Sequence, residues 1–272
     1  MPSSPSFVAG AVQLTSTADR ARNLDTSLRL VNEAAELGAK LIGLPENFAF
    51  MGRDEDRIAG AETVEGPTIS ALRDVARRRR VLVLAGSIAE KVDVPGKTAN
   101  TSVLVGDTGE LLAVYRKIHL FDVAIPDGAR YAESETVVAG DRAVVASTSL
   151  GRLGLTVCYD LRFPELYRRL SAEGADIICI PSAFTLYTGK DHWEVLVRAR
   201  AIENLAYVLA PAQVGRHSAN RVTFGNAMIV DPWGVVLARC PEGEGVCVAQ
   251  VRQDRIVAVR REIPALEHRK LT

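Results

Sequence analysis

The residue best suited to act as a nucleophile is a cysteine at the end of an apolar segment. Cys158 follows Leu153–Val157, and a helical segment is expected over Phe163–Glu173. A nucleophile on a sharp strand-to-helix turn is exposed, and nearby backbone N–H groups can bind a developing oxyanion. Most free cysteines are instead buried and inert. Position alone makes Cys158 a candidate nucleophile, with a structural cysteine as the alternative.

A cysteine nucleophile needs a base and a nearby positive charge. Two candidates are Glu46, just past the apolar run Lys40–Leu44, and Lys117. Ligand sites in open α/β sheets lie at the carboxyl ends of strands, so we expect Glu46 and Cys158 to face one crevice. A surface carboxylate and a surface ammonium are the alternatives. The histidines lie in no run that marks one as a partner of Cys158: His119, His192, His217 and His268.

The elements that would position these residues alternate between strands and helices. Phe7–Leu14 is a short apolar run that predicts a strand. A helix is expected next, with Asp19 as its cap and Gly38 as its terminator, because apolar residues recur at steps of three and four. Its predicted buried face consists of Ala21, Leu24, Leu28, Val31 and Ala35. A strand–helix–strand unit of this length predicts parallel strands joined by a right-handed crossover.

Further elements follow from the same criteria. In the first half we expect a helix over Thr68–Arg79, a strand over Val81–Ser87 and a hairpin over Val103–Tyr115. The segment Arg116–Arg130, which includes Pro126, Asp127 and Gly128, lacks periodicity, and long irregular segments are often functional. In the second half we expect strands over Leu153–Val157, Asp176–Ile180 and Ala206–Ala210, a helix over Trp193–Asn204, and a hairpin over Phe224–Ala238.

No linker rich in Gly, Ser or Pro divides the chain, so we predict one domain over residues 1–272 with helices outside a mixed sheet. The chain has 33 Lys plus Arg, 33 Asp plus Glu and 47% hydrophobic residues. This neutral balance argues against a nucleic-acid partner, and the apolar content argues against disorder. No segment resembles a secretion signal or a membrane helix. We therefore expect a cytoplasmic protein without a membrane partner.

The other cysteines are expected to be structural. Cys179 lies in an apolar strand, and Cys240 and Cys247 flank a turn. No pair has the spacing of a zinc ribbon or a thioredoxin-like motif.

Three segments together resemble the signature motifs of the nitrilase, or carbon–nitrogen hydrolase, superfamily: Leu44–Asn47, Arg116–Asp122 and Val157–Glu165. The resemblance covers nearly the whole chain and is greatest to its Nit-type amidase branch, which also fits Pro181–Phe184, His192–Glu194, Arg198–Glu203, Gly215–His217 and Asp231–Gly234. It implies an α/β fold, an αββα sandwich with two mixed sheets between outer helix layers. It also implies no metal, no organic cofactor, and a homodimer or higher homo-oligomer. The helix after Cys158 and the helix Trp193–Asn204 would form the dimer face.

The resemblance implies a catalytic triad of Glu46, Lys117 and Cys158. A second family glutamate matches Glu133, although the Pro-Gly that usually follows it is Ala139-Gly140 here. We expect Glu133 to hold Lys117 in place, or else to cap a turn. In the expected mechanism Glu46 takes the thiol proton, and Lys117 with the backbone N–H of Tyr159 forms the oxyanion hole. A thioester on the cysteine is then hydrolysed by water.

The branch implies a cysteine-dependent amidase that acts on a small carboxylate-bearing amide, with deaminated glutathione as the expected substrate. Arginine binds carboxylates through bidentate hydrogen bonds. The expected substrate-binding residues are Arg162, Phe184, Arg216, His217 and Arg221; a solvated loop is the alternative for the last three.

Other functions use the same residues. An ω-amidase acting on α-ketoglutaramate shares the triad, as do a nitrilase and a carbamoyl-amide hydrolase. A non-catalytic scaffold that keeps the fold is the alternative from a different class. A thiol peroxidase-like protein ranks last, because no resolving cysteine is evident by spacing.

Overall fold

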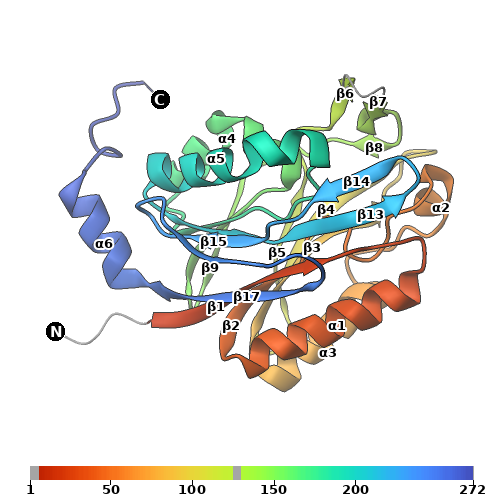
Figure 1. Ribbon diagram of the computed structural model, residues 1–272, viewed down its shortest axis with the longest axis horizontal. Coiled ribbons are helices and arrows are strands. Elements are labelled where there is room, and N and C mark those ends of the chain that lie inside the picture. The colour runs from red at the N-terminus through yellow and green to blue at the C-terminus, as the bar shows by residue number, and fades with distance from the viewer. Residues whose placement is uncertain (1–5, 125–129, 272) are drawn as a thin grey trace.

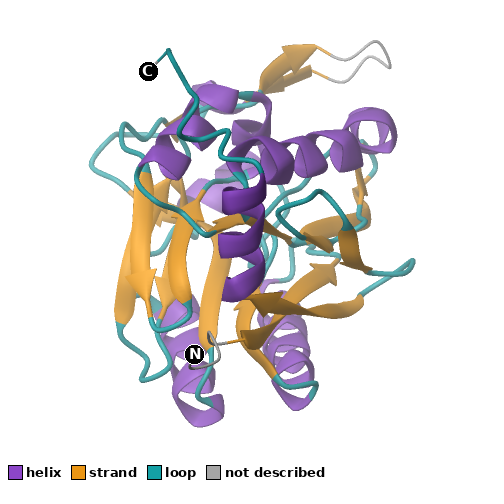
Figure 2. Cartoon of the chain, turned by 90° about the vertical axis from the view of Figure 1, so that its left-hand side faces the viewer, coloured by secondary structure: helices purple, strands orange, loops and turns teal. Residues whose placement is uncertain are grey.

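Two β-sheets lie face to face between two layers of helices in the computed structural model, which describes residues 6–124 and 130–271. In Figure 1, α4 (Pro164–Ala172) and α5 (Leu186–Asn204) cover one sheet, while α1 (Arg20–Glu36) and α3 (Pro67–Arg79) cover the other. Figure 2 shows the strands in the middle of the molecule, with helices above and below them. The predicted αββα sandwich is confirmed. The single domain over residues 1–272 stays a prediction.

The larger sheet holds nine strands among the described residues and is parallel at its centre, where β13, β1, β2 and β3 run side by side. Its strands are β1 (Ser6–Leu14), β2 (Ala39–Gly43), β3 (Leu82–Lys91), β4 (Thr98–Val105), β5 (Leu111–Arg116), β8 (Val137–Val138), β13 (Ala212–Ser218), β14 (Arg221–Phe224) and β17 (Gly245–Arg252). The predicted parallel pairing of the first two strands is confirmed.

The smaller sheet holds six strands of the described chain, with β10, β11 and β12 parallel at its centre. Its strands are β9 (Val144–Thr148), β10 (Gly151–Leu155), β11 (Ile177–Cys179), β12 (Tyr207–Ala210), β15 (Met228–Val230) and β16 (Val236–Arg239). A separate ribbon pairs β6 (Asp122–Ala124) with β7 (Arg130–Ala132). The remaining helical segments are α2 (Asp54–Ala59), α6 (Gln253–Glu262) and the 3-10 turns η1 (Glu133–Glu135) and η2 (Cys158–Arg162).

The strand β2 shows how the layers share their core. Leu41 belongs to the apolar cluster between the two sheets, and its neighbour Ile42 belongs to the cluster under α1 and α3. Successive side chains of a strand point to opposite faces, so both faces of this strand are buried. This explains why the sequence of the strand is continuously apolar. Within the described part of the chain, no helix is both long and apolar enough to span a bilayer.

The helix α1 begins and ends as predicted, and its buried face matches the predicted one in part. Val31 is buried, and Leu28 and Ala35 pack partly buried against the core. The Asp19 side chain accepts a hydrogen bond from the Arg22 N–H. Ala21 is exposed, and the buried residues are Asn23, Ser27, Leu30, Val31 and Ala34. Asn23 donates hydrogen bonds to the carbonyls of Thr17 and Ala49, 2.7 and 3.1 Å away. Apolar periodicity could not find the polar members of this face, because they are buried by satisfying backbone groups.

Other boundaries also differ from the predictions. The helix α5 starts at Leu186 rather than Trp193, because Thr185 caps it by accepting from the Thr188 N–H. The expected strand over Phe224–Val230 is split, since Gly225 and Asn226 have positive φ angles of 74° and 61°. The short helix α2 was not predicted. Pro126, Asp127 and Gly128, which belong to the segment expected to be irregular, lie outside the described residues.

A glycine in β3 allows the strand to pass close to the chain that carries Glu46. A Cβ on Gly86 would lie 1.9 Å from the carbonyl oxygen of Pro45 and 2.4 Å from that of Leu44. Both obstacles are backbone atoms, so they cannot move without displacing the next residue, Glu46.

We predict that Gly86→Ala destabilises the protein by about 1–3 kcal/mol, the usual cost of overpacking a buried site. The free energy of unfolding from denaturant titration measures this effect. Gly245→Ala is the matched control, because a Cβ there meets no atom within 4 Å. Equal stability of the two variants would contradict this explanation of Gly86.

Candidate active site

Three side chains from distant parts of the chain line one pocket of about 190 Å³. Glu46 follows β2, Lys117 follows β5, and Cys158 begins η2 after β10. Glu46 and Cys158 therefore lie beyond the carboxyl ends of their strands, but these strands belong to different sheets. The pocket lies where the two sheets meet, rather than at the edge of one sheet.

The turn that carries Cys158 is conformationally unusual. Cys158 has a φ of 49°, a left-handed conformation that side chains other than glycine seldom adopt. Its N–H donates a 2.9 Å hydrogen bond to the carbonyl of Pro181, and the side chain is almost fully buried yet reaches the pocket. Strained backbone of this kind is held in place by the surrounding structure and is concentrated at functional sites.

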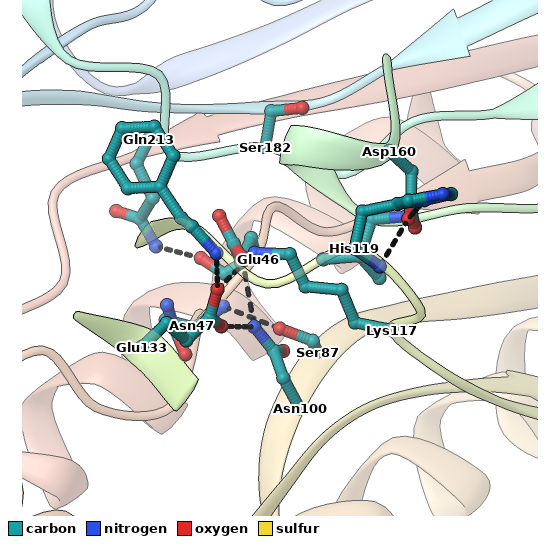
Figure 3. Close-up of polar contacts among 12 residues, drawn as sticks. Glu46, Asn47, Ser87, Asn100, Lys117, His119, Glu133, Asp160, Ser182 and Gln213 are labelled. Carbon is teal, nitrogen blue, oxygen red and sulfur yellow. Dashed lines mark hydrogen bonds and ion pairs between the residues drawn. The ribbon is translucent and has the colours of Figure 1, made fainter. Parts of the chain in front are cut away.

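Lys117 lies between two carboxylates. Its Nζ donates to Glu46 Oε1 at 3.0 Å and to Glu133 Oε2 at 2.8 Å (Figure 3). Only 2% of Lys117 and 3% of Glu46 is exposed. A buried ammonium needs compensating partners, and these two carboxylates supply them. Glu133 thus contacts Lys117 directly.

The loop around Glu133 is fixed by backbone contacts. Glu133 Oε2 also accepts a 2.7 Å hydrogen bond from the Phe121 N–H. Gly140 donates its N–H to the carbonyl of Lys117 at 2.8 Å. A Cβ on Gly140 would lie 2.2 Å from the carbonyl of Arg116. The glycine of Ala139-Gly140 therefore allows close backbone packing next to Lys117.

The chain around Glu46 is held by polar side chains of neighbouring strands. Gln213 Nε2 donates to the carbonyl of Glu46 at 3.0 Å and to Ser16 Oγ at 2.7 Å. The Asn47 N–H donates to Ser87 Oγ at 3.0 Å (Figure 3). These contacts fix the backbone on both sides of the carboxylate.

A buried aspartate links the Lys117 segment to the Cys158 turn. Asp160 accepts from the Val157 N–H at 2.8 Å and from the Tyr115 hydroxyl at 2.7 Å. His119 contacts the same carboxylate with its backbone N–H at 3.1 Å and its Nδ1 at 2.7 Å. Asp160 thereby connects residues on both sides of Lys117 with the residue before Cys158.

Asp160 was not predicted as a site residue, and His119 was assigned no role from the sequence. The signal that could have marked Asp160 is its place inside the Cys158 motif. Asn100, in the middle of β4, was missed as well, although it contacts both Glu46 and Glu133. Nothing in the local sequence distinguishes it from other strand residues.

The electrostatics keep the thiol protonated at rest. Burial, and then the Glu46 carboxylate, raise the pKa of Cys158 well above its ordinary value, while the Lys117 ammonium opposes them. Burial lowers the pKa of Lys117, but the carboxylates of Glu133 and Glu46 outweigh burial, so the pKa of Lys117 is raised. Burial also acts to raise the pKa of Glu133, but the Lys117 ammonium and the hydrogen bonds from Asn100 and the Phe121 N–H together outweigh burial, so the pKa of Glu133 is lowered. A neutral thiol beside a carboxylate is suited to attack that is coupled to proton transfer.

Some of the expected substrate-binding residues line the pocket and others do not. Arg162, Phe184 and Arg221 lie on its wall. The Arg162 guanidinium lies over the Phe184 ring, 5.3 Å from its centre. The structure does not place Arg216 or His217 on this wall, so their role in substrate binding stays a prediction.

Local contacts explain why these two residues point elsewhere. Arg216 is exposed and donates to the carbonyl of Ala219 at 2.9 Å. His217 is held by the Ser16 carbonyl at 2.8 Å and by Thr223 Oγ1 at 2.7 Å. Burial lowers the pKa of His217 to about 4, so the ring is neutral near pH 7. His217 therefore connects two strands.

The remaining cysteines are all buried and free: Cys179, Cys240 and Cys247. Among residues 6–124 and 130–271, no group of three or more His, Cys, Asp or Glu side chains could hold a metal ion.

We predict that Lys117→Met slows alkylation of Cys158 by iodoacetamide roughly tenfold or more near pH 8. The Lys117 charge lowers the pKa of the thiol, so its removal raises that pKa and moves the alkylation profile to higher pH. Mass spectrometry of the alkylated peptide measures the rate. Lys40→Met, at an exposed position in β2, is the control. An unchanged profile in the Lys117 variant would contradict the charge coupling.

Comparison with known proteins agrees with this geometry. A family model described as carbon-nitrogen hydrolase matches residues 8–261. The chain is 48% identical to a deaminated glutathione amidase of Synechocystis sp., over 97% of this chain and 98% of that protein.

Two solved structures are also similar. The C. elegans NitFhit protein has a TM-score of 0.93 and 36% identity, covering 98% of this chain and 66% of that chain. A Saccharomyces cerevisiae member of branch 10 of the nitrilase superfamily has a TM-score of 0.88 and 29% identity, covering 99% and 98% of the two chains. The chain therefore belongs to the carbon–nitrogen hydrolase family.

Proposed function

We propose that this carbon–nitrogen hydrolase is an amidase that cleaves deaminated glutathione through a thioester on Cys158. The observation that carries the proposal is the convergence of Glu46, Lys117 and Cys158 on one pocket, with the ammonium 3.0 Å from the Glu46 carboxylate. The similarity to relatives named deaminated glutathione amidase supports the substrate.

The first step forms a bond between Cys158 Sγ and the amide carbon. Because the pKa of the thiol is raised, the thiol needs a base at the moment of attack. Glu46 takes the proton while the carbonyl oxygen becomes an oxyanion. The Lys117 ammonium and the backbone N–H of Tyr159 stabilise that negative charge. Tyr159 directly follows the nucleophile and lines the pocket.

The second step breaks the carbon–nitrogen bond. Glu46 gives its proton to the leaving nitrogen, the amine departs, and the thioester remains on Cys158. Water then attacks the thioester carbon as Glu46 takes a proton from it. The carbon–sulfur bond breaks, the sulfur recovers the proton from Glu46, and the carboxylic acid product leaves. One carboxylate thus serves as base and acid in turn.

The pocket wall supports a substrate that bears carboxylates. Deaminated glutathione has two. Arg221 forms no ion pair or side-chain hydrogen bond within the described residues. The Arg162 guanidinium has no carboxylate partner there: it lies 3.3 Å from His192 Nδ1 and over the rings of Tyr159 and Phe184. A guanidinium without a carboxylate partner at a pocket wall can bind a substrate carboxylate in a bidentate manner. We assign this role to Arg162 and Arg221, with Phe184 packing against the substrate.

The exposed face of α5 supports the expected homodimer. Leu186, Tyr187, Val195 and Ile202 are large hydrophobic residues with between 45% and 66% of their surface exposed. Apolar patches of this kind commonly mark protein interfaces. We propose that α4 and α5 pack against their copies in a second chain. A cytoplasmic location is part of the same proposal, since four free cysteines suit a reducing compartment.

We predict that Arg221→Met lowers kcat/KM for deaminated glutathione roughly 10–100-fold, mainly by raising KM, because a charge-assisted hydrogen bond to the substrate is lost. Steady-state kinetics measure the effect. Arg216→Met is the matched control, since Arg216 is a nearby arginine that does not line the pocket. If both variants behave like the unmodified protein, Arg221 does not bind the substrate.

The same assay on four substrates tests the function. Deaminated glutathione should be hydrolysed with the highest kcat/KM, ahead of α-ketoglutaramate, an aliphatic nitrile and a carbamoyl amino acid. A higher value for α-ketoglutaramate would favour an ω-amidase. Absence of turnover on all four, with no covalent adduct on Cys158, would favour the scaffold alternative.

A further inference from the structure

We propose that Asn100 is a positioning residue that holds the carboxylates of Glu46 and Glu133 around Lys117 and directs one Glu46 oxygen toward Cys158. The inference rests on the proposed function, because it assumes that Glu46 acts as the base. Asn100 comes from the middle of β4, so a rigid strand rather than a loop supplies it.

Asn100 and Lys117 close a ring of hydrogen bonds with the two carboxylates. An amide nitrogen carries two hydrogens. Asn100 Nδ2 lies 2.9 Å from Glu46 Oε1 and 3.0 Å from Glu133 Oε1. Lys117 Nζ donates to the same two side chains (Figure 3). Within the ring each carboxylate therefore receives one charged and one neutral donor, and Glu133 also accepts the Phe121 N–H.

The ring makes the two oxygens of Glu46 unequal. Both donors, Asn100 Nδ2 and Lys117 Nζ, bind Oε1. The other oxygen, Oε2, receives neither of these bonds and is left for the thiol of Cys158. A carboxylate held by a single donor could rotate and exchange its oxygens. Two donors, one in β4 and one directly after β5, fix its orientation.

The choice of asparagine suits the charge balance of the site. Two carboxylates share one ammonium, so a neutral donor adds stabilisation without a further charge. The orientation of the amide is set by these carboxylates, because the flipped amide would place Oδ1 against both of them. Asn100 Oδ1 has no hydrogen-bond partner among the described residues and is buried. The hydrogen bonds donated by Nδ2 thus determine the orientation of the Asn100 side chain, since Oδ1 accepts none within the described residues.

Asn100 also anchors the backbone of Lys117. Its carbonyl accepts a 2.9 Å hydrogen bond from the Lys117 N–H. This backbone hydrogen bond remains when the Asn100 side chain is replaced, so a side-chain variant tests only the hydrogen bonds of the ring. Ser102 provides the matched control, since it lies two residues along β4 on the same face of the strand. It is also buried, and its hydroxyl has no partner in the described chain.

Loss of the Asn100 donor should change how the site responds to pH. A carboxylate that loses a hydrogen-bond donor keeps its proton to higher pH. The hydrogen bond from Asn100 is one cause of the lowered pKa of Glu133. The other charged or titratable groups that line the pocket are Lys117, Cys158, Asp54, Arg57, Arg130, Arg162, Arg221, Tyr131 and Tyr159. All of these groups are unchanged in the Asn100 variants. A shift of the acid limb of a pH–rate profile therefore reports on the hydrogen-bond ring that Asn100 and Lys117 form with the two carboxylates.

The test compares Asn100→Leu, Asn100→Ser and Ser102→Ala in the full chain. Two profiles are measured against pH: kcat/KM for deaminated glutathione, and the rate of Cys158 alkylation by iodoacetamide. We expect both Asn100 variants to lose kcat roughly 10–100-fold with a KM change under about threefold, and to move the acid limb of both profiles to higher pH. Ser102→Ala should match the unmodified protein. The serine variant keeps the test valid if the leucine variant does not fold.

The outcomes separate the two proposals. Asn100 variants with unshifted acid limbs and near-normal kcat would overturn the positioning role and leave the amidase function intact. An unmodified protein that hydrolyses no amide would overturn the function, while the alkylation profile would still decide the role of Asn100. A loss of activity with an unshifted acid limb would mean that Asn100 serves only the packing of β4.

Discussion

The site depends on a single buried ammonium that lies between two carboxylates. Lys117 is 3.0 Å from Glu46 and 2.8 Å from Glu133, and it is almost completely buried. Burying any one of these charges alone would be unfavourable. Together they keep the lysine charged and hold the Glu46 carboxylate in place. The ammonium also opposes the rise in the pKa of Cys158 that burial and the Glu46 carboxylate cause. In the proposed mechanism, nucleophile activation and oxyanion stabilisation thus rely on one group.

The fold supplies these charges from segments that only the two-sheet arrangement brings together. The larger sheet provides the base, the ammonium and Asn100, and the smaller sheet provides the nucleophile. Asp160 joins the two sets, since it binds the Tyr115 hydroxyl and the Val157 N–H. A hydrogen-bonded carboxylate that is fully buried specifies one arrangement strongly, because any other leaves it unpaired. This contact connects the packing of the sheets to the geometry of the site.

Sequence reasoning predicted much of the fold, because apolar periodicity and turn residues are local signals. The strands around β1 and β2 and the cap of α1 by Asp19 were predicted, and the resemblance implied the two-sheet sandwich and the triad. The buried face of α1 was predicted only in part, because Asn23 is buried through hydrogen bonds to distant carbonyls, which apolar periodicity does not reveal. Asn100 was missed because its importance arises from contacts with Glu46 and Glu133, which lie far from it in the sequence, and no local pattern reveals such contacts.

The account is tested most directly by acid quenching during turnover of deaminated glutathione, followed by mass spectrometry of the Cys158 peptide. We expect that peptide to carry the acyl part of the substrate without its amine, and the adduct to disappear once the substrate is consumed. A Cys158→Ala variant should form no adduct and lose turnover. Rapid hydrolysis by that variant, or turnover in the unmodified protein without any adduct, would contradict the thioester mechanism.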